Sequence, residues 1–149
     1  MPDLVIIGVD PGFANLGLAT VKRKGKMWWP DKLELLATKP SDKKRKVRAM
    51  DDNLRRVNEL SRAFRRRLDQ HRPIVVCTEA PSFTRNASSA FKAGLGWALV
   101  ITACAERDIP VLQMTPQEIK TTLCESGSAS KDTATTEIYT RYPNIRAQL

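Results

Sequence analysis

The chain has 149 residues, with 25 Lys or Arg against 16 Asp or Glu, and its formal net charge is +9 at neutral pH. This length and an apolar fraction of 42% predict one globular domain and exclude a disordered or fibrous chain. The sequence has no uninterrupted apolar run of the ~20 residues that a membrane span needs, and no signal-peptide pattern. We therefore expect a soluble, cytoplasmic protein that does not bind membranes.

Cysteine and histidine usage excludes several kinds of chemistry. Cys77, Cys104 and Cys124 cannot all pair with one another and form no C-x-x-C couple, which argues against a disulfide scaffold or a zinc finger. The only histidine, His71, follows a basic helical stretch, where we expect a solvated surface residue. Any catalysis is therefore expected to depend on carboxylates with a metal ion between them.

Three strands are predicted in the first quarter of the chain. A continuous β-branched apolar run at residues 4–9 predicts a buried strand, which ends in the turn Asp10-Pro11-Gly12. Further strands are expected at residues 16–21 and 33–37. A connection over residues 25–31, which carries Trp28 and Trp29, would join them as in an antiparallel meander.

A basic helix is predicted next, at about residues 47–70. Residues 39–72 hold 13 Lys or Arg and five Asp or Glu, so most of the net charge is concentrated there. This concentration favours a polyanionic partner, with nucleic acid first, although a solvated helix or a membrane-surface helix would also be basic. The apolar positions are spaced by three or four residues and predict one buried face: Val47, Met50, Leu54, Val57, Leu60, Phe64 and Leu68.

The second half of the chain alternates strands and helices. We expect a buried strand at residues 74–78, a loop over 80–86, an almost wholly apolar helix over 88–106 and a short strand at 110–114. Thr115, Pro116 and Glu118 predict the start of a helix with a capping box. Ser130 is expected to cap a last helix that reaches about Tyr142. This order predicts an α/β fold of three layers.

Two carboxylates follow apolar strands. Asp10 and Glu79 each stand at the carboxyl end of a predicted strand, the edge of an α/β sheet where ligands bind. If the strands are neighbours, the two groups could share Mg²⁺, which prefers oxygen ligands and bridges carboxylates to phosphates. Alternatively, Asp10 belongs to a simple turn and Glu79 pairs with an arginine. Lys120 and Lys131, on the two C-terminal helices, could neutralise a phosphate or could be solvated surface lysines.

Three blocks of residues occur in the order found in one nuclease family. Gly8-Val9-Asp10-Pro11-Gly12 with Gly17 resembles the first-strand motif of the RuvC-type Holliday-junction resolvases. The second block consists of Glu79, Asn86, Ser89, Ala90, Gly94 and Ala98. The third consists of Thr115-Pro116, Ile119-Lys120 and Gly127-Ser128-Ala129-Ser130-Lys131. The resemblance covers about residues 4–137.

The resemblance implies an RNase H-like three-layer α/β/α domain with a mixed central sheet. It implies a homodimer, formed through the helix at 88–106, that cuts four-way (Holliday) or other branched DNA junctions by paired nicks. Asp10 and Glu79 would hold Mg²⁺, or Mn²⁺ in its place, and Lys120 and Lys131 would act at the phosphate. The expected DNA-binding residues are Lys43, Lys44, Arg45, Lys46, Phe83, Arg85 and Asn86.

Two departures from the family pattern leave alternatives open. The family completes its metal site with acidic residues on a final helix, and that point lies just beyond Leu149. We therefore expect a single domain without its last helix, and a non-catalytic protein that binds branched DNA is the alternative function. Ser82 occupies the position of a junction-probing aromatic residue, so Phe83 is the candidate for stacking on a base. A fragment of an actin-like or sugar-kinase-like phosphotransferase is a further alternative.

Overall fold

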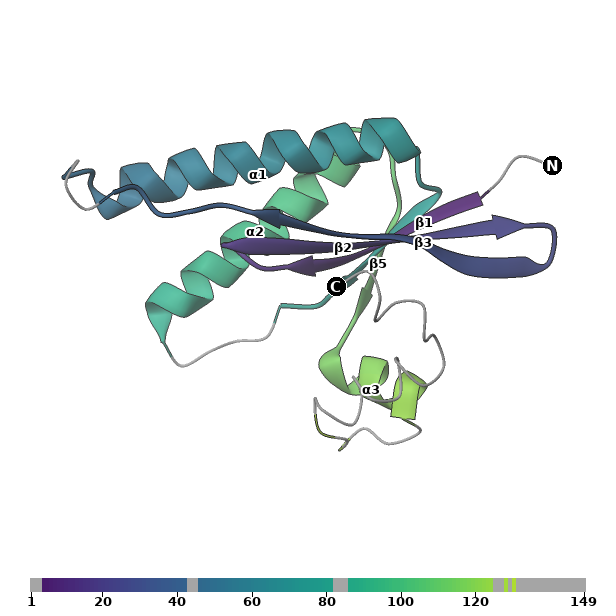
Figure 1. The fold of residues 1–149 in the computed structure, drawn as a ribbon. Helices are drawn as coiled ribbons and strands as arrows, with labels where there is room; N and C mark the ends of the chain where they lie inside the picture. Colours follow the sequence, from purple (N-terminus) through teal and green to yellow (C-terminus); the bar gives the residue numbers. More distant parts are fainter. Residues whose placement is uncertain (1–3, 43–45, 82–85, 125–127, 129, 131–149) are drawn as a thin grey trace.

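The computed structural model describes residues 4–42, 46–81, 86–124, 128 and 130. Its strands form one mixed sheet in the order β3-β2-β1-β4-β5 (Figure 1). The neighbours β1–β2 and β2–β3 are antiparallel, whereas β1–β4 and β4–β5 are parallel. The elements are β1 (Leu4–Pro11), β2 (Asn15–Lys24), β3 (Met27–Ala37), α1 (Ala49–His71), β4 (Val75–Glu79), α2 (Ala87–Ala105), β5 (Val111–Met114) and α3 (Pro116–Cys124).

The hairpin of β2 and β3 is longer than the sequence predicts. The expected connection over residues 25–31 is wrong, because Trp28 and Trp29 belong to β3 and pair with Arg23 and Lys22 of β2. The chain reverses within a tight turn at Gly25, whose positive φ of 60° glycine adopts without steric cost. The lysines on both sides of the turn favour the prediction of a loop, because their polarity is typical of loops. The sequence therefore did not predict that β3 begins at Met27.

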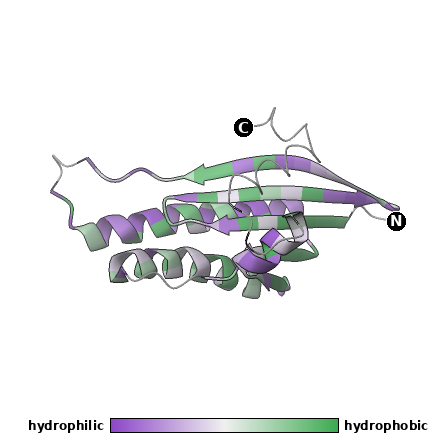
Figure 2. Cartoon of the chain, turned by 90° about the horizontal axis from the view of Figure 1, so that it is seen from below, coloured by the Kyte–Doolittle hydropathy of each residue, from purple (hydrophilic) through white to green (hydrophobic). Residues whose placement is uncertain are grey.

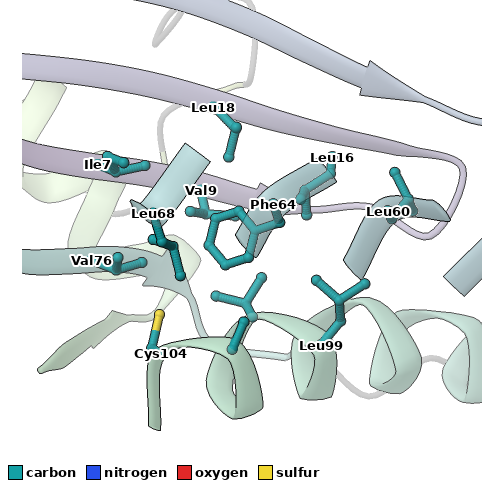
Figure 3. Packing of buried hydrophobic residues seen from close by; sticks show 12 residues of the cluster. Ile7, Val9, Leu16, Leu18, Leu60, Phe64, Leu68, Val76, Leu99 and Cys104 are labelled. Carbon is teal, nitrogen blue, oxygen red and sulfur yellow. The ribbon is translucent and has the colours of Figure 1, made fainter. Parts of the chain in front are cut away.

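The core lies between one face of the sheet and the two long helices. Ile7 and Val9 of β1, Leu16 and Leu18 of β2, and Val76 of β4 are buried against these helices. Phe64 of α1 is fully buried at the centre of this cluster, and Leu99 and Cys104 of α2 close it from the other side (Figure 3). Alternate residues of each strand therefore point away from α1 and α2, toward the opposite face of the sheet.

Only part of the predicted apolar stripe of α1 enters this core. Leu60, Phe64 and Leu68 are buried, but the exposed fractions of Val47, Met50 and Leu54 are 44%, 63% and 62%. The expectation of one continuous buried face is wrong because the first turns of α1 extend past the end of the sheet (Figure 1).

Two polar residues of α1 are less exposed than the sequence predicts. Arg56 is buried, with its guanidinium 4.6 Å from the ring centre of Phe13. The expectation that His71 is a solvated residue is also wrong. This side chain is partly buried, and its Nε2 atom is buried without a hydrogen-bond partner in the described part of the chain.

α2 is long and apolar enough to cross a membrane by length and composition, contrary to our expectation from uninterrupted apolar runs. Lys92 and several small polar residues break the run without lowering its mean hydropathy below the level of a span. α2 is drawn largely in white and green in Figure 2, whereas α1 alternates between purple and green. Because Leu99, Val100 and Ala103 are buried in the core shared with the sheet, α2 packs as a core helix.

α3 begins with the predicted capping box. The backbone N–H and the hydroxyl of Thr115 donate to the Glu118 carboxylate at 2.7 and 2.8 Å, and the Glu118 N–H donates to the Thr115 hydroxyl at 3.2 Å. These reciprocal bonds satisfy N–H groups that a helix start leaves unpaired. The expected last helix, over residues 130–142, lies almost wholly outside the described residues.

Candidate active site

Asp10 and Glu79 lie side by side at the carboxyl ends of two adjacent strands. β1 and β4 are parallel, and Val9 pairs with Thr78, so the next position of each strand carries a carboxylate. Val9 and Thr78 are buried on the helix side of the sheet, which directs Asp10 and Glu79 to the opposite face. The two acids that the sequence predicts as neighbours therefore follow paired positions of adjacent strands and face the same side of the sheet.

The turn that follows Asp10 depends on close backbone packing. The Gly12 N–H donates to the Asp10 carbonyl at 2.9 Å, and a Cβ at Gly12 would lie 2.3 Å from the Asn15 carbonyl oxygen. From the other side, Gly96 of α2 approaches Pro11 so closely that a Cβ would lie 2.2 Å from the Pro11 carbonyl oxygen. Both distances are far below van der Waals contact, so glycine is required at each position. α2 thereby supports the turn that carries Asp10.

The two carboxylates stand at one end of a groove of about 730 Å³ on the open face of the sheet. Gly17 is the β2 partner of Asp10, and Gly8 pairs with Ala19, so the central strands present little side-chain bulk there. The remaining walls are mostly apolar, with Glu34 and Thr78 as polar members, and the apolar residues from β3, β4, β5 and α3 are Leu33, Leu35, Cys77, Met114 and Ile119. Burial raises the pKa of the Cys77 thiol, so this group is protonated at neutral pH.

The donor set fits a hard divalent cation. Asp10 is exposed and Glu79 is partly buried, so their oxygens can bind an ion that keeps some of its water ligands. Within the described ranges, no group of three or more His, Cys, Asp or Glu side chains is arranged to hold a metal. The two carboxylates are therefore the part of a metal site that these residues supply.

The other predicted site residues fall in several places. Lys120 is on α3, next to the groove residue Ile119, and is partly buried, but it does not line the groove. Asn86 caps α2 by accepting a hydrogen bond from the Ser89 N–H at 3.1 Å, which gives it a structural role as well. Lys46 is exposed just before α1, with a positive φ of 46°. The remaining predicted residues, Lys43, Lys44, Arg45, Phe83, Arg85 and Lys131, lie outside the described residues.

Sequence analysis missed a polar network that fastens the start of the basic segment to α1. Asp52 accepts hydrogen bonds from the Ser41 N–H and hydroxyl at 3.1 and 2.5 Å and from Arg55 at 2.7 Å. Arg55 also donates to the Lys39 carbonyl at 2.7 Å. The Ser41 hydroxyl and then Arg55 lower the pKa of Asp52 to about 2, so it is ionised at neutral pH.

The same network reaches the turn that follows Asp10. Arg56 donates to the Thr38 hydroxyl at 3.0 Å, and the Thr38 N–H donates to the Ala14 carbonyl at 2.9 Å. The guanidinium of Arg56 also lies over Phe13 in that turn. The segment that leads into the basic run is thus anchored to α1 at the end of the sheet where β1 carries Asp10. The spacing of aspartate and arginine on α1 was the only sequence signal for this anchor.

Comparison with known proteins agrees with this arrangement. The sequence profile of the crossover junction endodeoxyribonuclease RuvC family matches residues 6–147. A crossover junction endodeoxyribonuclease RuvC of Carboxydothermus hydrogenoformans is 30% identical over 126 residues, which cover 85% of this chain and 73% of that protein. The structure of Thermus thermophilus RuvC in complex with a Holliday junction substrate superposes with a TM-score of 0.76 and 27% identity, covering 94% of this chain and 80% of that one.

A more distant structure shares the fold alone. The yeast mitochondrial Holliday junction resolvase Ydc2 superposes with a TM-score of 0.56 at 12% identity, covering 96% of this chain and 61% of that one. The mixed sheet, with acidic residues at the ends of its two central parallel strands, has the architecture of the RNase H-like nucleases. Within that class, the chain belongs to the RuvC family.

Proposed function

We propose that this chain is a structure-selective endodeoxyribonuclease that resolves four-way DNA junctions by paired nicks, using a divalent ion held by Asp10 and Glu79. The observation that carries the proposal is the shared register of these two carboxylates on β1 and β4. Two carboxylates at neighbouring strand ends are oxygen donors that a divalent cation can bridge to a phosphodiester substrate.

Mg²⁺ is the ion that we propose, with Mn²⁺ as a substitute, because the two donors are hard oxygen ligands. When bound, such an ion lowers the pKa of a water ligand and neutralises charge on the leaving oxygen. Asp10 and Glu79 would hold it from one side and leave the groove side open to DNA. Lys120 and Lys131 are proposed to offset the charge of the scissile phosphate. Lys120 starts from α3, which contributes Ile119 to the groove wall.

The basic segment is proposed to bind the DNA backbone. Lys43, Lys44, Arg45 and Lys46 come soon after the anchored residues 38–41 in the sequence, and α1 begins at Ala49. Phe83, Arg85 and Asn86 are proposed to contact the junction from the loop that leaves Glu79, with Phe83 stacking on an unpaired base. Contacts of this kind position DNA without reading its sequence, which suits an enzyme that selects structure.

Paired nicks require two active sites, so we also propose a homodimer through α2 and a cytoplasmic location. Phe91, near the start of α2, is 48% exposed, and Met50 and Leu54, near the start of α1, are also exposed. The two helices begin toward the same end of the molecule (Figure 1). A second copy packed on this surface would cover these apolar side chains. Phe91→Glu should shift the protein to a monomer in sedimentation analysis. A dimer that survives this change would contradict the interface.

The activity test uses a labelled four-way junction and a linear duplex of matched sequence, with Mg²⁺ or with EDTA. Wild type should nick the junction in both strands only when Mg²⁺ is present. Asp10→Asn should bind the junction and lose cleavage, whereas the control Asp108→Asn, an exposed residue beyond the end of α2, should cut normally.

Three results would contradict the proposed activity. Cutting of the linear duplex at the same rate would refute structure selectivity. Cleavage in EDTA would refute the role of the ion. Junction binding by wild type without any cleavage would favour a non-catalytic junction-binding protein.

A further inference from the structure

The tip of the β2–β3 hairpin is strongly basic and lies outside the site described above. Residues 22–31 contain Lys22, Arg23, Lys24 and Lys26 against one acidic residue, Asp31. Lys22 pairs with Asp31 at 3.0 Å. No described carboxylate lies within 4.0 Å of the charged groups of the other three cations. The tip therefore presents positive charge that the described part of the protein does not neutralise.

The side chains at this tip are ordered as well as charged. The guanidinium of Arg23 lies 5.3 Å from the ring centre of Trp28, and its Nε donates to the Gly25 carbonyl at 2.7 Å. Trp28 is 45% exposed and Met27 is 73% exposed. An arginine held by a ring and a backbone carbonyl loses little further conformational entropy when it binds an anion.

The tip shares one face of the sheet with the two carboxylates. Gly17 is the β2 partner of Asp10, and Arg23 lies six positions further along β2, so the Arg23 side chain points to the same open face as Asp10. At about 3.3 Å per residue this separation is about 20 Å. Duplex DNA rises about 3.4 Å per base pair, so this distance corresponds to about six base pairs.

We propose that the hairpin tip binds backbone phosphates of a junction arm, about six base pairs from the phosphate at Asp10 and Glu79. This inference rests on the proposed function, because that function places DNA at the carboxylates. Arg23, on the open face, and Lys26, in the turn, supply the phosphate contacts, and Trp28 holds the Arg23 guanidinium in place. DNA fits better than an anionic membrane, because the tip offers only two well-exposed large apolar side chains and lies on the face that carries the metal site.

The test compares Arg23→Gln/Lys26→Gln with the charge-preserving control Arg23→Lys/Lys26→Arg. Each phosphate contact contributes about 0.9 to the slope of log affinity against log salt. Between about 50 and 200 mM salt, wild type and the control should therefore lose about tenfold more junction affinity than the neutral variant. Equal slopes for all three proteins would overturn the proposal.

Neutral methylphosphonates in one arm locate the contact. At about six base pairs from the cut, they should weaken binding by wild type and leave the neutral variant unaffected, whereas substitutions about twelve base pairs away should affect neither. A loss that is equal in both proteins would overturn the contact. The contact would also be overturned, in favour of a membrane, if the neutral variant bound anionic vesicles more weakly than wild type does but bound the DNA junction equally well. These measurements are of binding, so a failure of the proposed cleavage remains a separate result.

Discussion

The close approach of α2 to the turn after Asp10 makes Gly96 a sensitive position. In Gly96→Ala the new Cβ would start 2.2 Å from the Pro11 carbonyl oxygen, so α2 or the turn must move by about 1 Å. Overpacking of this kind costs about 1–3 kcal/mol, of which the higher helix propensity of alanine recovers up to about 1 kcal/mol. The movement also displaces Asp10, so metal affinity should fall together with stability.

Gly94 on the same helix provides the matched control. A Cβ at Gly94 would meet no atom within 4 Å, so Gly94→Ala should raise the unfolding free energy by up to about 1 kcal/mol. In urea denaturation followed by circular dichroism, the unfolding free energy should be highest for Gly94→Ala, intermediate for wild type and lowest for Gly96→Ala. If Gly96→Ala is as stable as Gly94→Ala, the packing of α2 on the turn is not as described.

Three further predictions concern stability. Thr115→Ala removes the two hydrogen bonds that the hydroxyl makes in the capping box of α3 and should lower the unfolding free energy by about 1 kcal/mol in urea denaturation. Phe64→Ala empties the centre of the core and should cost about 3–5 kcal/mol in the same assay, and a loss below about 1 kcal/mol would contradict its burial. The pKa of Asp52 is lowered from 3.8 to about 2, so its stabilising effect is complete above the ordinary value and is lost as the pH falls toward 2. Asp52→Asn should flatten this acid part of the stability curve, and an unchanged curve would refute the network.

The sequence predicted the positions of the two carboxylates because both follow apolar strands with clear boundaries. Successive side chains of a strand point to opposite faces of the sheet. Because Val9 of β1 pairs with Thr78 of β4, the residues that follow them, Asp10 and Glu79, point to the same face. The capping box at Thr115 could also be predicted, because its partner Glu118 is only three positions away in the sequence.

Features that depend on where the sheet ends could not be predicted. The apolar spacing of α1 continues through Met50 and Leu54, but none of the described strands lies beneath these turns, and both side chains are exposed. Burial of Arg56 depends on Phe13 and Thr38, which are distant in the sequence. The extension of β3 through Trp28 follows from pairing with β2, which overrides the loop-like polarity of the lysines around Gly25.

Titration of Mn²⁺ into the full chain, followed by electron paramagnetic resonance, tests most directly whether one ion is shared between the central strands. Wild type should bind one tight ion, and Asp10→Asn and Glu79→Gln should each weaken binding of that ion about tenfold or more, because each change removes one of its ligands. A variant that binds Mn²⁺ as wild type does, or two variants that each lose a different ion, would contradict a shared site.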